Sequence, residues 1–162
     1  MKKTALSLTM FAALSACTSV YVPTFKEIGV IPAKTGVINT SVKEYKLSRT
    51  HWTDVAKIRD EAFRLSDQVS KGSLTKVQAA QLLNRFRVKL IGHNDVDDSV
   101  YDVYLRSAVD SQRGVITTEQ SKQYIQNALK GWQQRWHGIQ EKPDNPAFTN
   151  FLLEVMKMEP LK

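Results

Sequence analysis

Apolar side chains recur every three or four residues after about residue 50, which is the pattern of amphipathic helices. The first such run covers residues 52–69, with charged residues between the apolar positions. Gly72 follows it as a helix-ending residue, and Thr75 with Gln78 forms a T-x-x-Q capping box that starts a second helix, which ends at Gly92. The pattern predicts two helices joined by a short turn.

A third and a fourth helix are predicted from the same signals. Asn94 or Asp95 can cap the third helix, and Gly114 ends it. Thr117 with Gln120 then repeats the capping box at the start of the fourth helix. We therefore expect a second pair of helices built like the first.

One offset of 42 residues relates the two pairs, because it aligns both capping boxes and several residues before them. The further matches are His51 with His93, Asp60 with Asp102, and Arg64 with Arg106. We interpret them as an internal duplication of a helix–turn–helix unit, over residues 51–92 and 93–138, that packs on its own copy. Chance matching is the alternative interpretation.

The last part of the chain predicts one more short helix. Pro143 separates it from the fourth helix, Asn145 is expected to cap it, and Pro146 is expected to take its first position before Phe148 and Phe151. The predicted fold is an all-α bundle of four to five helices, formed by two tandem helix–turn–helix units within a domain of residues 51–162.

Residues 17–50 keep no helical period and contain Pro23 and Pro32, so we interpret them as an extended tether. Within the tether, the β-branched and aromatic residues between Val37 and Leu47 predict a short strand or an extended arm that lies on the domain.

The first 16 residues have the three parts of an export signal: Lys2 and Lys3, an apolar run from Thr4 to Leu14, and small residues after it. The apolar run is shorter than the roughly 20 residues that a permanent membrane span needs. Residues 1–16 are therefore expected to be a cleaved signal peptide.

Leu14-Ser15-Ala16-Cys17 resembles the lipobox of bacterial lipoproteins. The resemblance covers residues 1–17 and implies that the Cys17 thiol is diacylated, that the chain is cut before Cys17 and that the new amino terminus is acylated. An ordinary secretory signal with an incidental cysteine is the alternative. Cys17 is the only cysteine of the chain, so the mature domain is expected to have no disulfide bond.

In lipoproteins of this class, an Asp after the cysteine tends to retain the protein at the inner membrane. Thr18 occupies that position here, which implies an outer-membrane location, with the domain on the periplasmic face. Loss of Lys2 and Lys3 with the signal lowers the formal net charge from +7 to +5. This charge favours anionic lipid head groups, lipopolysaccharide phosphates or an acidic protein surface, whereas export argues against a nucleic-acid partner.

The two predicted turns resemble degenerate EF-hand loops that begin at Asp67 and at Val109. Gly72 and Gly114 then occupy the sixth position of their loops, as in a calcium-binding loop. Calcium needs several oxygen ligands, but the ligand positions hold Val69, Lys71 and Gln78 in one loop, and Val109, Arg113 and Gln120 in the other. We expect no metal, and either plain capped turns or an EF-hand-like pair that has lost its calcium.

The acidic run Asp95, Asp97 and Asp98 is interpreted as a negatively charged helix start.

The sequence contains no recognisable catalytic or cofactor motif. His51, His93 and His137 have no ligand-type spacing and are expected in surface or helix-capping roles. A nucleophile elbow and a Gly-rich phosphate loop are missing, whereas a pair of carboxylates assembled in space leaves no sequence signature. No cofactor is expected.

The strongest binding candidate is an aromatic face on the fourth helix. Tyr124, Trp132 and Trp136 are spaced by multiples of four and therefore share one face, with Arg135 beside it. Such a face is either core or a contact surface for a partner helix or a glycan. From their positions in the helix, we expect Trp132 to be buried and Trp136 to be partly exposed.

Together these features predict a membrane-anchored envelope lipoprotein that is not an enzyme. We expect it to act as a binding or assembly factor for an envelope protein. The alternative is a cell-wall (peptidoglycan) enzyme or an inhibitor of one, for which a cleft with convergent titratable groups would be expected.

Overall fold

The computed structural model describes residues 44–162, and the described chain is all-α. Its helices are α1 (His51–Ser70), α2 (Lys76–Ile91), α3 (Asp95–Gln112), α4 (Thr118–Trp136) and α5 (Ala147–Val155). The predicted bundle of two helix–turn–helix units is confirmed. Cys17, the signal peptide and most of the predicted tether lie outside the described residues.

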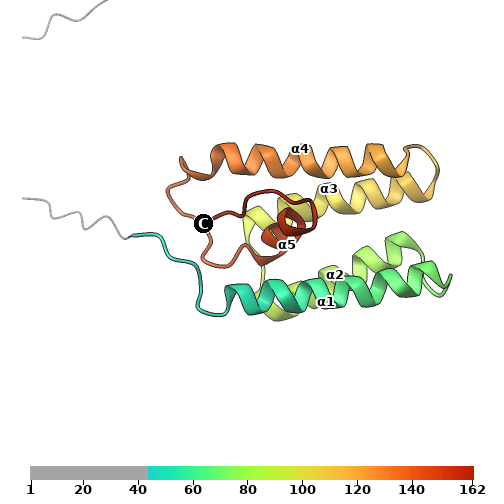
Figure 1. The fold of residues 1–162 in the computed structure, drawn as a ribbon, viewed down its shortest axis with the longest axis horizontal. Coiled ribbons are helices and arrows are strands. Elements are labelled where there is room, and N and C mark those ends of the chain that lie inside the picture. The colour runs from blue at the N-terminus through green and yellow to red at the C-terminus, as the bar shows by residue number, and fades with distance from the viewer. Residues whose placement is uncertain (1–43) are drawn as a thin grey trace, which may run out of the picture. The chain divides into compact units, whose positions relative to one another are not determined.

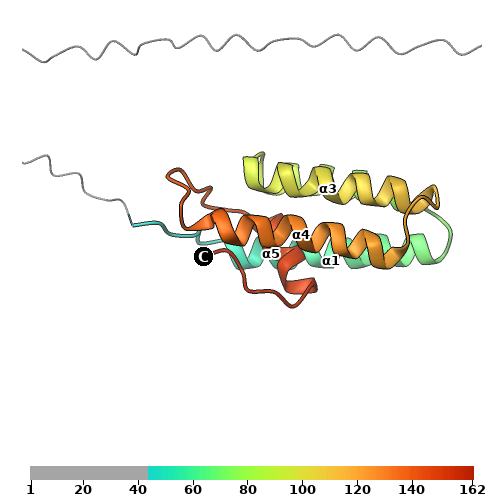
Figure 2. The same ribbon diagram turned by 90° about the horizontal axis from the view of Figure 1, so that it is seen from above.

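The four long helices form two antiparallel hairpins, α1–α2 and α3–α4, and α5 lies between the hairpins (Figures 1 and 2). Neighbouring helices pack in chain order, α1 on α2, α2 on α3, and α3 on α4. α1 and α4 do not pack extensively on each other, and α5 contacts both of them instead. None of the helices within residues 44–162 is both long and apolar enough to cross a bilayer.

Both hairpin turns have the predicted local structure. The Thr75 hydroxyl oxygen accepts a hydrogen bond from the Gln78 N–H, and the Thr75 N–H donates to the Gln78 side-chain oxygen. Thr117 and Gln120 repeat this arrangement. The glycines that end α1 and α3 have φ of 72° at Gly72 and 71° at Gly114, a conformation that other residues adopt only with strain. The two units therefore share their turns in detail.

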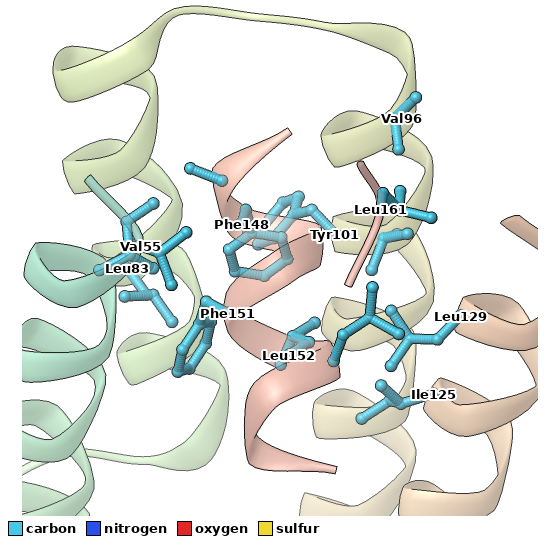
Figure 3. Close-up of a cluster of buried hydrophobic side chains, with 14 of the residues drawn as sticks. Val55, Leu83, Val96, Tyr101, Ile125, Leu129, Phe148, Phe151, Leu152 and Leu161 are labelled. Carbon is cyan, nitrogen blue, oxygen red and sulfur yellow. The ribbon is translucent and has the colours of Figure 1, made fainter. Parts of the chain in front are cut away.

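The core lies where α5 enters the space between the hairpins. Figure 3 shows Phe148, Phe151 and Leu152 of α5 between Leu83 of one hairpin and Leu129 of the other. All five side chains are at most 4 % exposed. At roughly 1.5–3 kcal/mol for each fully buried large apolar side chain, this cluster is a main source of stability.

An anchoring contact for α5 comes from α3. The Asp97 carboxylate accepts hydrogen bonds from the N–H groups of Phe148 and Thr149 and from the Thr149 hydroxyl, at 3.2, 2.8 and 2.7 Å. No side chain of α5 itself caps this end, so Asp97 does so from 51 residues away in the sequence. Burial raises the pKa of Asp97, and the hydrogen bonds act in the opposite direction. The acidic start of α3 is confirmed, but Asp97 also serves a second helix.

Two predictions about the start of α5 were wrong. Pro146 precedes the first helical residue instead of taking that position, a shift of one residue. Asn145 does not cap α5: its side-chain oxygen accepts a hydrogen bond from the His51 ring at 2.7 Å, and its NH₂ donates to Asp54 at 3.0 Å. This long-range pairing prevails because it satisfies polar groups that the packing of α1 buries.

In the described part of the tether, residues 44–48 have no regular secondary structure and lie on the domain beside the α4–α5 connection, and residues 49–50 form a turn before α1. Ser48 donates its N–H to the Asp144 carbonyl, and the Tyr45 hydroxyl donates to the Pro143 carbonyl. Residues 44–47 therefore fit the extended arm and form no strand, whereas residues 37–43 lie outside the described part. The chain enters at the end of the bundle where the C-terminus also lies, opposite the two hairpin turns (Figure 1).

Candidate functional site

A hollow of about 270 Å³ lies between the four long helices, in the half of the bundle that contains the hairpin turns. Its lining is mainly apolar or small: Ala62, Leu65, Ser66, Val69, Lys76, Ala79, Leu83, Tyr104, Ala108, Ser111, Thr118, Ser121 and Ile125. The hollow is partly open to solvent, and α1 and α4, which both contribute to its lining, do not pack extensively on each other. It is slightly smaller than the roughly 300–1,000 Å³ of most small-molecule pockets.

Twelve of the thirteen lining residues form six pairs related by the 42-residue offset. The pairs are Ala62 with Tyr104, Ser66 with Ala108, Val69 with Ser111, Lys76 with Thr118, Ala79 with Ser121, and Leu83 with Ile125. Equivalent positions of the two units thus face the same space, as expected when two copies of one motif pack around a local two-fold axis.

Small residues create the hollow. Ala62, Ala79 and Ala108 occupy positions on the inner faces of their helices where a larger apolar side chain would fill the space. Hydrophobic periodicity alone does not reveal such a site, because Ala satisfies the pattern as well as Leu does. Aligning the two units and comparing side-chain volumes at equivalent positions is the signal that could have found it.

The electrostatics of the hollow are simple. Lys76 is its only charged lining residue, and the Lys76 ammonium donates a hydrogen bond to the Ser111 hydroxyl at 2.9 Å. The N-termini of α2 and α4 lie in the same half of the bundle and carry partial positive charge. Burial raises the pKa of the Tyr104 phenol, so this side chain stays protonated at neutral pH and can donate a hydrogen bond. The hollow therefore suits an apolar ligand surface with a negatively charged edge.

The predicted aromatic face on α4 does not behave as one surface. Trp136 is 2 % exposed: its indole N–H donates to the Lys162 carbonyl at 3.0 Å, and Tyr45 packs edge-on against its ring. Trp132 is only partly buried and donates to the Ser99 hydroxyl at 3.3 Å. The predicted order of burial was therefore wrong, because the tether and the C-terminal residues cover the end of α4.

The other members of the predicted face remain at the surface. Tyr124 is 48 % exposed, and Arg135 places its guanidinium 4.5 Å from the centre of the Trp132 ring. A partner-binding role for Trp132, Tyr124 and Arg135 stays a prediction, whereas Trp136 is a core residue.

The histidines differ in their surroundings. His93 is largely exposed and pairs with Asp98 at 3.0 Å, and His137 is exposed at the end of α4, as predicted. His51 contradicts the prediction of a surface or capping role, because it is 0 % exposed. Its Nε2 accepts a hydrogen bond from the Asn150 amide at 2.8 Å, and its Nδ1–H donates to Asn145.

Within residues 44–162, no three His, Cys, Asp or Glu side chains come together in the manner of a metal site. No protein family, characterised protein or solved structure matches the chain. The hollow and its lining are therefore the basis for a functional proposal.

Proposed function

We propose that this protein is a lipid-anchored envelope protein that performs no chemistry and binds an envelope partner in the hollow between its hairpins. The lipid anchor follows from the lipobox resemblance at Cys17. The observation that carries the binding role is the solvent-open, mainly apolar hollow, to which both units contribute equivalent residues.

The lining supports binding more than catalysis. An enzyme site is expected to bring several titratable groups together around a reacting atom. Here the titratable lining residues are Lys76, whose ammonium bonds to Ser111, and Tyr104, whose pKa is raised. The remaining lining offers shape, apolar contact and a few hydroxyl groups, which are the properties of a recognition surface.

The position of the hollow fits an anchored protein. Residues 44–48 lie against the end of the bundle near Pro143 and Asp144, whereas the hollow lies near the hairpin turns. A protein held through the tether would present the hollow at the end away from the tether. This arrangement leaves the hollow accessible to a second envelope component.

The test is a comparison of partners captured in cells by cross-linking and mass spectrometry. Ser121→Leu adds apolar volume to the hollow, and Gln81→Leu adds the same side chain on an exposed position of α2. We expect at least one envelope protein to be captured by the wild type and by Gln81→Leu and to be lost with Ser121→Leu, while all three proteins melt cooperatively. Identical captured sets for the three proteins would contradict the proposal.

A further inference from the structure

The space between the hairpins is already occupied over part of its length by a helix. α5 contributes seven buried residues from a length of nine, and it packs on α1, α3 and α4. Its apolar side chains meet Leu83 of one hairpin and Ile125 of the other in the core (Figure 3). The bundle therefore holds a short, apolar helix between its hairpins.

The hollow continues from the place that α5 occupies. Leu83 and Ile125 belong both to the core around α5 and to the lining of the hollow, and they form one of the six repeat-related pairs. The four long helices line the hollow, and the same four helices contribute the core residues around α5. An occupant of the hollow would thus extend the packing that α5 begins.

Two exposed apolar residues belong to segments next to the hollow, one on α1 beside the lining residue Ala62 and one at the end of α5. Arg59 holds the end of α5 through a hydrogen bond to Glu154 at 2.7 Å, and Val155 next to Glu154 is 47 % exposed. Phe63 is one helical turn beyond Arg59, next to the lining residue Ala62, and it is 60 % exposed. An acyl chain enclosed by the lining residues would leave Phe63 exposed, because Phe63 is not one of them, whereas a helix that also rests on the α1 surface beside Ala62 would have an apolar side chain to pack on.

The size and charge of the hollow limit which side chains an occupant could place in it. Because a cavity of about 150 Å³ accepts a benzene-sized ligand, the hollow of about 270 Å³ has room for roughly two bulky side chains. Two such side chains project from one face of a helix when they are three or four residues apart. Lys76 and the N-termini of α2 and α4 favour a carboxylate at the end near the hairpin turns.

From these observations we propose that the hollow is the docking site for an amphipathic helix of an envelope partner. The helix presents two bulky apolar side chains three or four residues apart, and a carboxylate that meets Lys76. This inference rests on the proposed function, because it specifies the partner that the hollow binds.

The experiment places a photoreactive amino acid at Ser66, in the lining, or at Phe63, beside the lining residue Ala62, in the full-length protein in cells. Gln81, on an exposed position of α2, is the matched control. Cross-linked products are digested and the attachment points are mapped by mass spectrometry. Circular dichroism of each purified variant checks that the helices are intact.

We expect adducts from positions 66 and 63 to map to one partner segment, at residues spaced three, four or seven apart, and to be missing for position 81. Lys76→Glu should lower the yield several-fold, and replacing the partner carboxylate with Lys should restore it. Attachment to a lipid, to a second copy of this chain, or to partner residues spaced two apart as in a strand would overturn the helix inference while a ligand-binding hollow remained. No adduct at either position would overturn the proposed function itself.

Discussion

The acid sensitivity of the fold follows from the surroundings of His51. Burial lowers the pKa of this imidazole below its ordinary value of 6.5, although Asn145, Asp97 and Asp54 act in the opposite direction. The unfolded chain therefore takes up a proton near pH 6.5, while the folded chain keeps His51 neutral. The free energy of unfolding should fall as the pH drops below 6.5 and should level off below the folded pKa.

The hydrogen bonds of His51 give a structural reason why its pKa is lowered. Nε2 of His51 accepts from the Asn150 NH₂ group, which also donates to the Leu161 carbonyl at 2.9 Å, and the Asn150 oxygen accepts from the Leu161 N–H at 2.7 Å. A proton on Nε2 would face this NH₂ group. Turning the Asn150 amide to accept that proton would break both bonds to Leu161. Protonation is thus coupled to the docking of the C-terminal segment.

The expected change in the free energy of unfolding is set by the uptake of one proton. Over the pH range in which only unfolded His51 is protonated, stability changes by about 1.4 kcal/mol per pH unit. A domain of this size has a free energy of unfolding of roughly 5–15 kcal/mol, so the change over one pH unit is measurable.

Urea unfolding between pH 8 and pH 5 would measure this effect in the wild type, in His51→Gln and in the matched control His93→Gln. His93 is largely exposed and lies outside the buried hydrogen-bond network of His51, so His93→Gln makes the same substitution without touching that network. His51→Gln should be less stable at pH 8 and should lose the extra slope below pH 6.5. If His51→Gln unfolds altogether, NMR titration of His51 in the wild type gives its pKa directly. An identical slope in His51→Gln, or a measured His51 pKa above 6.5, would refute the reasoning.

Four further outcomes are expected. Cys17→Ser should abolish fatty-acid labelling and release the protein from the membrane fraction, and unchanged labelling would contradict lipidation. Trp136→Ala should cost about 3–5 kcal/mol in urea unfolding and Trp132→Ala clearly less, because only Trp136 is fully buried; equal losses would contradict this. Asp97→Ala should cost about 3 kcal/mol or more, since it leaves buried donors of α5 without an acceptor, and it should speed hydrogen exchange at Thr149 first. Millimolar calcium should not shift the melting temperature, and a rise of several degrees would show that the hairpin turns bind the ion.

Local features could be predicted from the sequence because their causes lie within a few residues. The capping boxes at Thr75 and Thr117 and the glycines at 72 and 114 each act within one helical turn, so neighbouring residues specify them. The second helix was predictable as far as Gly92 for the same reason, since a capped start is followed by good helix formers.

Long-range features could not be predicted in this way. Trp136 is buried by Tyr45 and Lys162, which lie far from it in the sequence, so its place near the end of α4 suggested the opposite. Asp97 and Asn145 have short-range signatures of helix capping, yet their side chains bond to groups that the tertiary fold brings to them. Partner choice for a buried polar group depends on packing, which periodicity does not encode.

Covalent fusion of the two units has a consequence for the binding surface. In a symmetric dimer of a single unit, every substitution would appear on both walls of the hollow, and the two walls would be chemically identical. In one chain the walls can differ: Lys76 is equivalent to Thr118, and Ala62 is equivalent to Tyr104. The two walls of the hollow are therefore chemically different, so that the partner helix proposed above would have one favoured orientation.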